Sequence, residues 1–119
     1  MWVGGFWPNL APFRRAAQWD GVYPLNRNEE EPLSPADIRS ILEYVHRFRT
    51  TDAPFDIANS GYTSGTDPDR AAQHVGKYAD AGLTWWMENI NPFRFGWQMQ
   101  GPWPVEAMRE RILQGPPKL

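Results

Sequence analysis

Residues 67–90 read DPDRAAQHVGKYADAGLTWWMENI and hold one complete helix-then-strand unit. Asp67 can cap a helix that Pro68 opens, because a first helical position does not need the N–H that proline lacks. The inner face of this helix is predicted from apolar residues at helical spacing: Ala71, Val75 and Tyr78 or Ala79. Gly82 suits the left-handed residue after a helix, and the apolar run 83–87 predicts a strand that stops at Glu88-Asn89.

The same order of signals occurs along the rest of the chain. The other predicted strands are short apolar runs: Trp2-Val3 ending at Gly4-Gly5, Val22–Leu25, and Phe55–Ala58 ending at Asn59-Ser60-Gly61. The other predicted helices begin at a proline: Pro12, Pro35 after the capping residue Ser34, and Pro104. Their inner faces are predicted at Phe13, Ala16 and Ala17, at Ile38, Ile41, Leu42, Val45 and Phe48, and at Val105, Met108, Ile112 and Leu113. Strand starts lie about 20 to 33 residues apart, as in βαβ units.

Four βα units in sequence order predict an α/β fold with a parallel sheet and helices on one face. We interpret residues 1–119 as a single half-barrel domain, half of a (β/α)8 TIM barrel. The inner face of such a half has nothing on it. We therefore expect exposed inner positions there, beyond what monomers usually tolerate, drawn from Trp2 or Val3, Val22 or Tyr23, Phe55, Ile57, Trp85 and Met87.

Three arrangements resolve this exposure. Two copies can close one barrel about a two-fold axis, which is the arrangement that we favour. The chain can instead pair with a complementary N-terminal half-barrel. In the third arrangement, the helices cover both faces of a small doubly wound sheet.

Composition excludes several classes of protein. The 119 residues carry a net charge of −2, which does not suit a nucleic-acid binder. There is no cysteine for a disulfide or a thiolate metal site, and no apolar run reaches the length of a membrane span. The start, MWVGGFWPNL, lacks the features of a secretory signal, and we expect a cytoplasmic protein. The connector 26–32, with Glu29, Glu30 and Glu31, is predicted to be a solvated loop.

The stretches MWVGGFWPNLAPFRRAAQWDGVYPL, SPADIRSILEYVHRFR, PFDIANSG and DPDRAAQHVGKYADAGLTWWMENI, with the tail RERILQGPP, are similar in order to the C-terminal portion of the luciferase-like monooxygenases. The resemblance covers essentially the whole chain and implies a flavin- or deazaflavin-dependent oxidoreductase on a (β/α)8 barrel. The N-terminal half of the family's barrel is absent from this sequence.

The resemblance implies FMN or a deazaflavin as cofactor, with its phosphate near the first strand. The implied cofactor-binding residues are Gly4, Gly5, Phe6, Arg14, Arg15, Trp85, Glu88 and Asn89. Glycines and a helix start suit close approach to a phosphate, and an arginine adds a charge-assisted bond. The same residues also suit a strand-to-helix turn that needs glycine, with the arginines facing solvent.

Other candidates are less specific. Asn59, Ser60, Glu88 and Asn89 follow strands, where barrel enzymes place active-site groups, but they also suit ordinary polar strand ends. Trp85 and Trp86 are expected on opposite faces of a strand, as core packing or as a wall for a ring. His46 and His74 have no partner at metal-ligand spacing. No catalytic residue is assigned and no metal site is predicted.

Two functions remain in competition. The first is a luciferase-like flavin-dependent oxidoreductase half-barrel that needs a second half for activity. The second is a non-catalytic half-barrel fragment or interaction module that associates through its open sheet face. The substrate and the choice between flavin and deazaflavin are left open.

Overall fold

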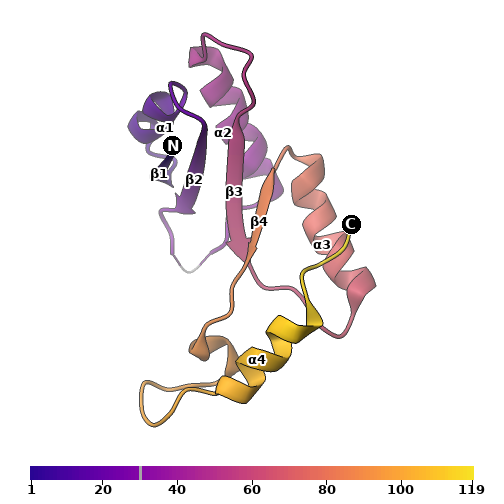
Figure 1. Cartoon of the computed structure of the whole chain (residues 1–119). Helices are drawn as coiled ribbons and strands as arrows, with labels where there is room; N and C mark the ends of the chain where they lie inside the picture. The colour runs from indigo at the N-terminus through magenta and orange to yellow at the C-terminus, as the bar shows by residue number, and fades with distance from the viewer. Residues whose placement is uncertain (30) are drawn as a thin grey trace.

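Four parallel strands form one sheet in the order β1-β2-β3-β4, which is their order in the sequence. The structure, a computed structural model, describes residues 1–29 and 31–119 (Figure 1). The strands are β1 (Trp2–Trp7), β2 (Gly21–Asn26), β3 (Asp56–Gly61) and β4 (Trp85–Glu88). The helices are α1 (Leu10–Ala16), α2 (Pro35–Phe48), α3 (Pro68–Asp80) and α4 (Val105–Gln114), with a 3-10 helix η1 (Pro92–Phe95). The predicted alternation of strands and helices in a parallel sheet is confirmed, and Glu30 of the acidic connector lies outside the described residues.

The helix starts are where the sequence predicts them for α2 and α3. Ser34 and Asp37 form a capping box at α2, with Pro35 in the first turn. The side chain of Asp67 accepts a hydrogen bond from the Arg70 N–H at the start of α3. These local bonds satisfy N–H groups that a helix leaves without an internal partner, which is why the sequence signal is reliable here.

The two faces of the sheet differ in what covers them. The helix-facing side carries Val3, Val22 and Ile57, all buried against the inner residues of α1 and α2. The expectation that Ile57 lies exposed on the inner face is therefore wrong, because alternation along β3 turns this side chain towards the helices. Trp86 of β4 lies on the same side and contacts Tyr78 of α3, with ring centroids 5.4 Å apart. The core therefore lies between the sheet and a single layer formed by α1, α2 and α3 (Figure 1).

The opposite face, which we call the open face, remains exposed. Alternation along each strand and the strand register assign its large apolar residues: Trp2, Phe6, Leu25, Trp85 and Met87. Each of these side chains is 39% to 53% exposed. The Trp2 and Trp85 rings meet with centroids 5.9 Å apart, and Trp2 occupies the space where Gly21 has no side chain. Trp85 and Trp86 lie on opposite faces, as the alternation predicts.

The molecule is extended for its length. Its radius of gyration is 16.0 Å, with principal extents of 48 × 32 × 23 Å. A compact domain of this length would have a radius of about 13.5 Å. Part of the difference comes from α4, which lies beyond the carboxyl ends of the strands and away from the helix layer (Figure 1).

Several predicted boundaries are wrong, among them that of β4, which begins at Trp85 rather than at residue 83 and includes Glu88. β1 continues through Gly4 and Gly5 to Trp7, and β3 includes Asn59-Ser60-Gly61. Both segments keep pairing with a neighbouring strand, which overrides the low strand propensity of these residues. Helix α1 begins at Leu10, so Pro12 is its third residue. Proline is tolerated there because the first four N–H groups of a helix have no internal acceptor.

The last helix also departs from the prediction. Val105, Ile112 and Leu113 were expected to face inward, yet they are 59% to 77% exposed, and the buried residue of α4 is Arg111. The physical reason is the position of α4. It lies beyond the end of the sheet, where no apolar surface is available to cover its apolar side chains.

Gly5 provides a direct test of the packing between β1 and α1. A Cβ atom at Gly5 would lie 2.5 Å from Cβ of Pro12, whereas one at Gly4 would lie 4.0 Å from the Tyr23 carbonyl oxygen. We predict that Gly5→Ala lowers the free energy of unfolding by about 1–3 kcal/mol, because α1 must move away from the strand. Gly4→Ala is the matched control and should change it by less than about 0.5 kcal/mol. Urea denaturation measures both variants, and equal losses would contradict this packing.

Candidate functional site

Strands β2 and β3 separate towards their carboxyl ends. They pair only at Gly21–Asp56 and Val22–Ile57, although each strand continues for four more residues. The N–H of Arg27 donates to the Trp7 carbonyl on β1. Backbone N–H and C=O groups alternate in direction along a strand, so those of Pro24, three residues earlier, point to the opposite side, towards β3. Proline has no N–H to donate, so the ladder cannot continue past Val22. The two strands therefore leave a gap that other groups must line.

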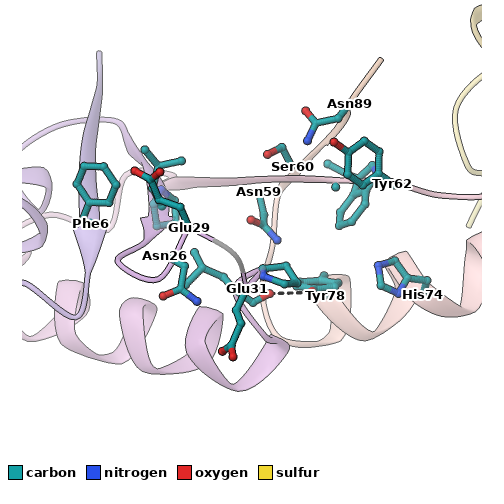
Figure 2. A pocket seen from close by; sticks show the side chains of 16 residues that line it. Phe6, Asn26, Glu29, Glu31, Asn59, Ser60, Tyr62, His74, Tyr78 and Asn89 are labelled. Atoms are coloured by element: carbon teal, nitrogen blue, oxygen red, sulfur yellow. Dashed lines mark hydrogen bonds between the residues drawn. The ribbon is translucent and has the colours of Figure 1, made fainter. Parts of the chain in front are cut away.

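A cleft of about 540 Å³ occupies this gap at the carboxyl end of the sheet (Figure 2). Its volume lies within the range typical of small-molecule sites. Its lining comes from all four strands, from the connector before α2, from α3, and from residues just after β3 and β4: Phe6, Pro24, Leu25, Asn26, Glu29, Glu31, Pro32, Leu33, Asn59, Ser60, Gly61, Tyr62, His74, Tyr78, Trp86 and Asn89.

Asn59 is the most deeply placed polar side chain of the cleft. It projects from the helix-facing side of β3 and is only 5% exposed. Its amide nitrogen Nδ2 is buried and has no hydrogen-bond partner among the residues that the structure describes. In Figure 2 the Asn59 side chain points from the strand into the space above Tyr78. A buried amide without a partner costs free energy, so this donor favours a site that an acceptor can enter.

Aromatic side chains form the wall of the cleft towards α3. Trp86 contacts the rings of Tyr78 and His74, with centroids 5.4 and 5.5 Å away. The Tyr78 hydroxyl donates a 2.6 Å hydrogen bond to the Leu33 carbonyl, which ties α3 to the segment before α2. Burial and the nearby Asp37 carboxylate raise the pKa of Tyr78, so this hydroxyl stays protonated at neutral pH.

The rim of the cleft is acidic. Glu29 and Glu31 line it from the connector after β2, and both are exposed. Within the described part of the chain, no lysine or arginine lines the cleft. The electrostatic environment therefore disfavours an anionic group and tolerates a neutral or cationic one.

Glu88 at the end of β4 organises a second polar cluster beside the cleft. Its carboxylate pairs with Arg94 of η1 at 2.8 Å and with Arg111 of α4 at 3.3 Å. It also accepts hydrogen bonds from the backbone and hydroxyl of Thr63 and from the Trp86 ring nitrogen. Burial alone would raise the pKa of Glu88, but these hydrogen bonds and the one from Arg94 together lower it below its ordinary value.

This cluster fixes the C-terminal segments to the sheet. Arg94 also donates to the carbonyls of Thr63 and Asn89, and Arg111 donates to the Thr63 hydroxyl and to the Gly115 carbonyl. The ionised carboxylate of Glu88 is bound by two arginines, by Thr63 and by Trp86, so Glu88 acts as a structural anchor rather than as a free acid or base.

The predicted cofactor residues do not come together at one place. Phe6 and Asn89 line the cleft, and Trp85 lies on the open face. Arg14 and Arg15 lie exposed in the last turn of α1, where Arg14 covers the Phe48 ring. Neither Gly4 nor Gly5 has a positive φ, and Gly5 allows Pro12 of α1 to approach the strand.

The histidines do not form a metal site. His46 is exposed and contacts the Phe55 ring, and exposed His74 contacts the rings of Tyr78 and Trp86. Throughout residues 1–29 and 31–119, no group of three or more His, Cys, Asp or Glu side chains is arranged to hold a metal ion.

Sequence reasoning identified some residues of the site and missed others. Asn59 and Ser60 were candidates because they lie near a strand end, and both line the cleft. Arg94 and Arg111 were missed, since nothing in the local sequence marks a residue whose partner is Glu88. The proline in β2 was the available signal for the separation of β2 from β3.

Comparison with known proteins gives no relative for this fold or site. No protein-family model matches the chain, and no curated protein or solved structure is significantly similar to it. None of the helices in the described ranges has both the length and the apolar character needed to cross a bilayer.

The Glu88 cluster gives a prediction about stability. Glu88→Gln leaves the Arg94 and Arg111 guanidinium groups without a counter-charge, and their side chains are only 15% and 6% exposed. We expect a loss of about 3 kcal/mol at pH 7. Glu43→Gln, an exposed change on α2, is the control and should have little effect.

The pH dependence follows from the lowered pKa of Glu88. The stabilisation is fully present above the unfolded-state pKa of about 4.3 and is lost as pH falls through the lower folded-state value. The difference between wild type and Glu88→Gln should therefore shrink below about pH 4, as measured by thermal unfolding across pH. A difference that stays constant down to about pH 2.5 would contradict the role of the ionised carboxylate.

Proposed function

We propose that this chain is a half-barrel of the luciferase-like flavin-dependent oxidoreductases and works only when a second half covers its open face. The observation that carries the proposal is the arrangement of the sheet. Four parallel strands in sequence order have their helix layer on one side and exposed apolar residues on the other. All-parallel sheets are stable when both faces are covered.

The occupant that we favour is a second copy of the chain. β1 and β4 are both edge strands, so a two-fold axis can join each edge to the other copy and close eight strands. The residues of the open face then become the interior of a closed barrel, where bulky apolar side chains are the norm. A complementary N-terminal half-barrel can cover the same open face.

The cofactor is proposed to bind at the carboxyl end of the completed barrel, where Phe6 and Asn89 line the cleft. Trp85 on the open face supplies a flat ring for the barrel interior. FMN or a deazaflavin would supply the redox chemistry, while this chain orients the ring. Arg14 and Arg15, the phosphate ligands that the resemblance implies, lie outside the cleft lining.

The oligomeric state tests the coverage of the open face. We predict that the wild-type chain is a dimer at micromolar concentration by size-exclusion chromatography with light scattering. Met87→Lys places a charge on the open face and should give a monomer, because a desolvated charge at such an interface has no partner. Ile112→Lys is the matched control on α4 and should remain dimeric. A folded wild-type monomer would contradict closure by a second copy.

Flavin binding tests the oxidoreductase assignment separately. We expect titration with riboflavin phosphate or a deazaflavin to change cofactor fluorescence at about 100 µM. Phe6→Ala should weaken binding by about tenfold through the lost ring contact. Phe93→Ala, at an exposed position of η1 outside the cleft lining, is the control. No signal with either cofactor in a dimeric sample would exclude the flavin reading.

The alternative is a non-catalytic interaction module. It is favoured by the state of Glu88, because the carboxylate at the end of β4 is fully engaged in ion pairs and hydrogen bonds. A dimer that binds neither cofactor would support this alternative over the enzyme.

A further inference from the structure

We propose that the cleft between β2 and β3 binds a neutral, planar ring compound that carries a carbonyl oxygen. The carbonyl oxygen accepts a hydrogen bond from Asn59 Nδ2, and the ring lies against the aromatic wall formed by Trp86 and Tyr78. This is the cleft at which the cofactor is proposed to bind. The present proposal rests only on lining residues of this chain, and it requires neither the second half nor the flavin.

The donor requirement comes from Asn59. Only 5% of Asn59 is exposed, and no described residue accepts a hydrogen bond from its Nδ2. The neighbouring polar groups are already used. Tyr78 donates to Leu33, and Ser60 receives the Tyr23 hydroxyl hydrogen bond at 3.0 Å on the other side of the strand. A ligand acceptor therefore supplies the bond that the protein does not make.

The planar requirement comes from the wall of the cleft. Trp86 and Tyr78 meet at an interplanar angle of 52°, and His74 stands edge-on to Trp86 at 86°. These rings are fixed by their contacts with one another and by the Tyr78 hydrogen bond to Leu33. A flat ring gains contact area against such a wall without ordering flexible side chains.

The charge requirement comes from the rim. Glu29 and Glu31 are the charged residues that line the described cleft, so an anion would meet repulsion with no compensating lysine or arginine among the described lining. The hydrogen bond to Asn59 alone would favour an anionic acceptor as well. The acidic rim therefore favours a neutral acceptor, such as a carboxamide, over an anionic one.

Nicotinamide and nicotinate form a matched pair of probes for this site. Both are small flat rings, but one ends in a neutral carboxamide and the other in a carboxylate. We expect nicotinamide, at up to about 10 mM, to shift the Asn59 side-chain amide resonances in a nitrogen-15 correlation spectrum. Nicotinate should bind at least about fivefold more weakly. Equal or tighter binding of nicotinate, or unmoved Asn59 resonances, would overturn the proposal.

The variant Asn59→Leu separates a binding role from a structural one and identifies the Asn59 resonances by their loss. Removing a donor without a partner should leave the melting temperature unchanged or raised, while the affinity for nicotinamide falls by about two- to tenfold. Asn26→Leu is the control, because the Asn26 side chain lines the same cleft but already accepts from the Asn28 N–H. A lowered melting temperature with an unchanged affinity in Asn59→Leu would show that Asn59 stabilises the fold and does not bind the ligand.

Discussion

The bare side of the parallel sheet is the constraint on which the rest of the structure depends. Successive right-handed crossovers bring α1, α2 and α3 to one side of β1-β2-β3-β4. That side is buried well, with Val22 and Ile57 fully enclosed. The other side keeps Trp2, Trp85 and Met87 in contact with water. Burial of apolar area is the main source of stability, so a partner that covers this side gains what the single chain leaves unused.

The separation of β2 from β3 has a different origin and a different consequence. Pro24 has no N–H to donate to the β2–β3 ladder, and these two strands separate towards the carboxyl end of the sheet. Asn59 lies on β3 beside this gap, where it lines the cleft and keeps a buried donor without a partner among the described residues. Beside it, Glu88 holds η1 and α4 by ion pairs. A break in backbone pairing thus creates the candidate site, and a charged anchor keeps the C-terminal segments beside it.

The sequence predicted the features that depend on near neighbours. The capping box at Ser34, the start of α3 at Asp67 and the opposite faces of Trp85 and Trp86 all follow from local rules, and the structure contains them. The errors concern residues whose state depends on distant partners. Gly4 and Gly5 remain in β1 because β2 pairs with them, and Ile112 is exposed because α4 does not reach the core. The pairing of Glu88 with Arg111 joins β4 to the last helix and has no local signal.

The coverage of the open face can be measured in solution by hydroxyl-radical footprinting at low and high protein concentration. Met87 lies on the open face, and Met99 lies in the loop after η1 with 73% of its side chain exposed, so it serves as an internal reference. Our account predicts that oxidation of Met87 and Trp85 slows as the concentration rises, while oxidation of Met99 stays constant. Equal oxidation of Met87 at all concentrations, in a folded and stable chain, would contradict the claim that this face is covered by a second copy.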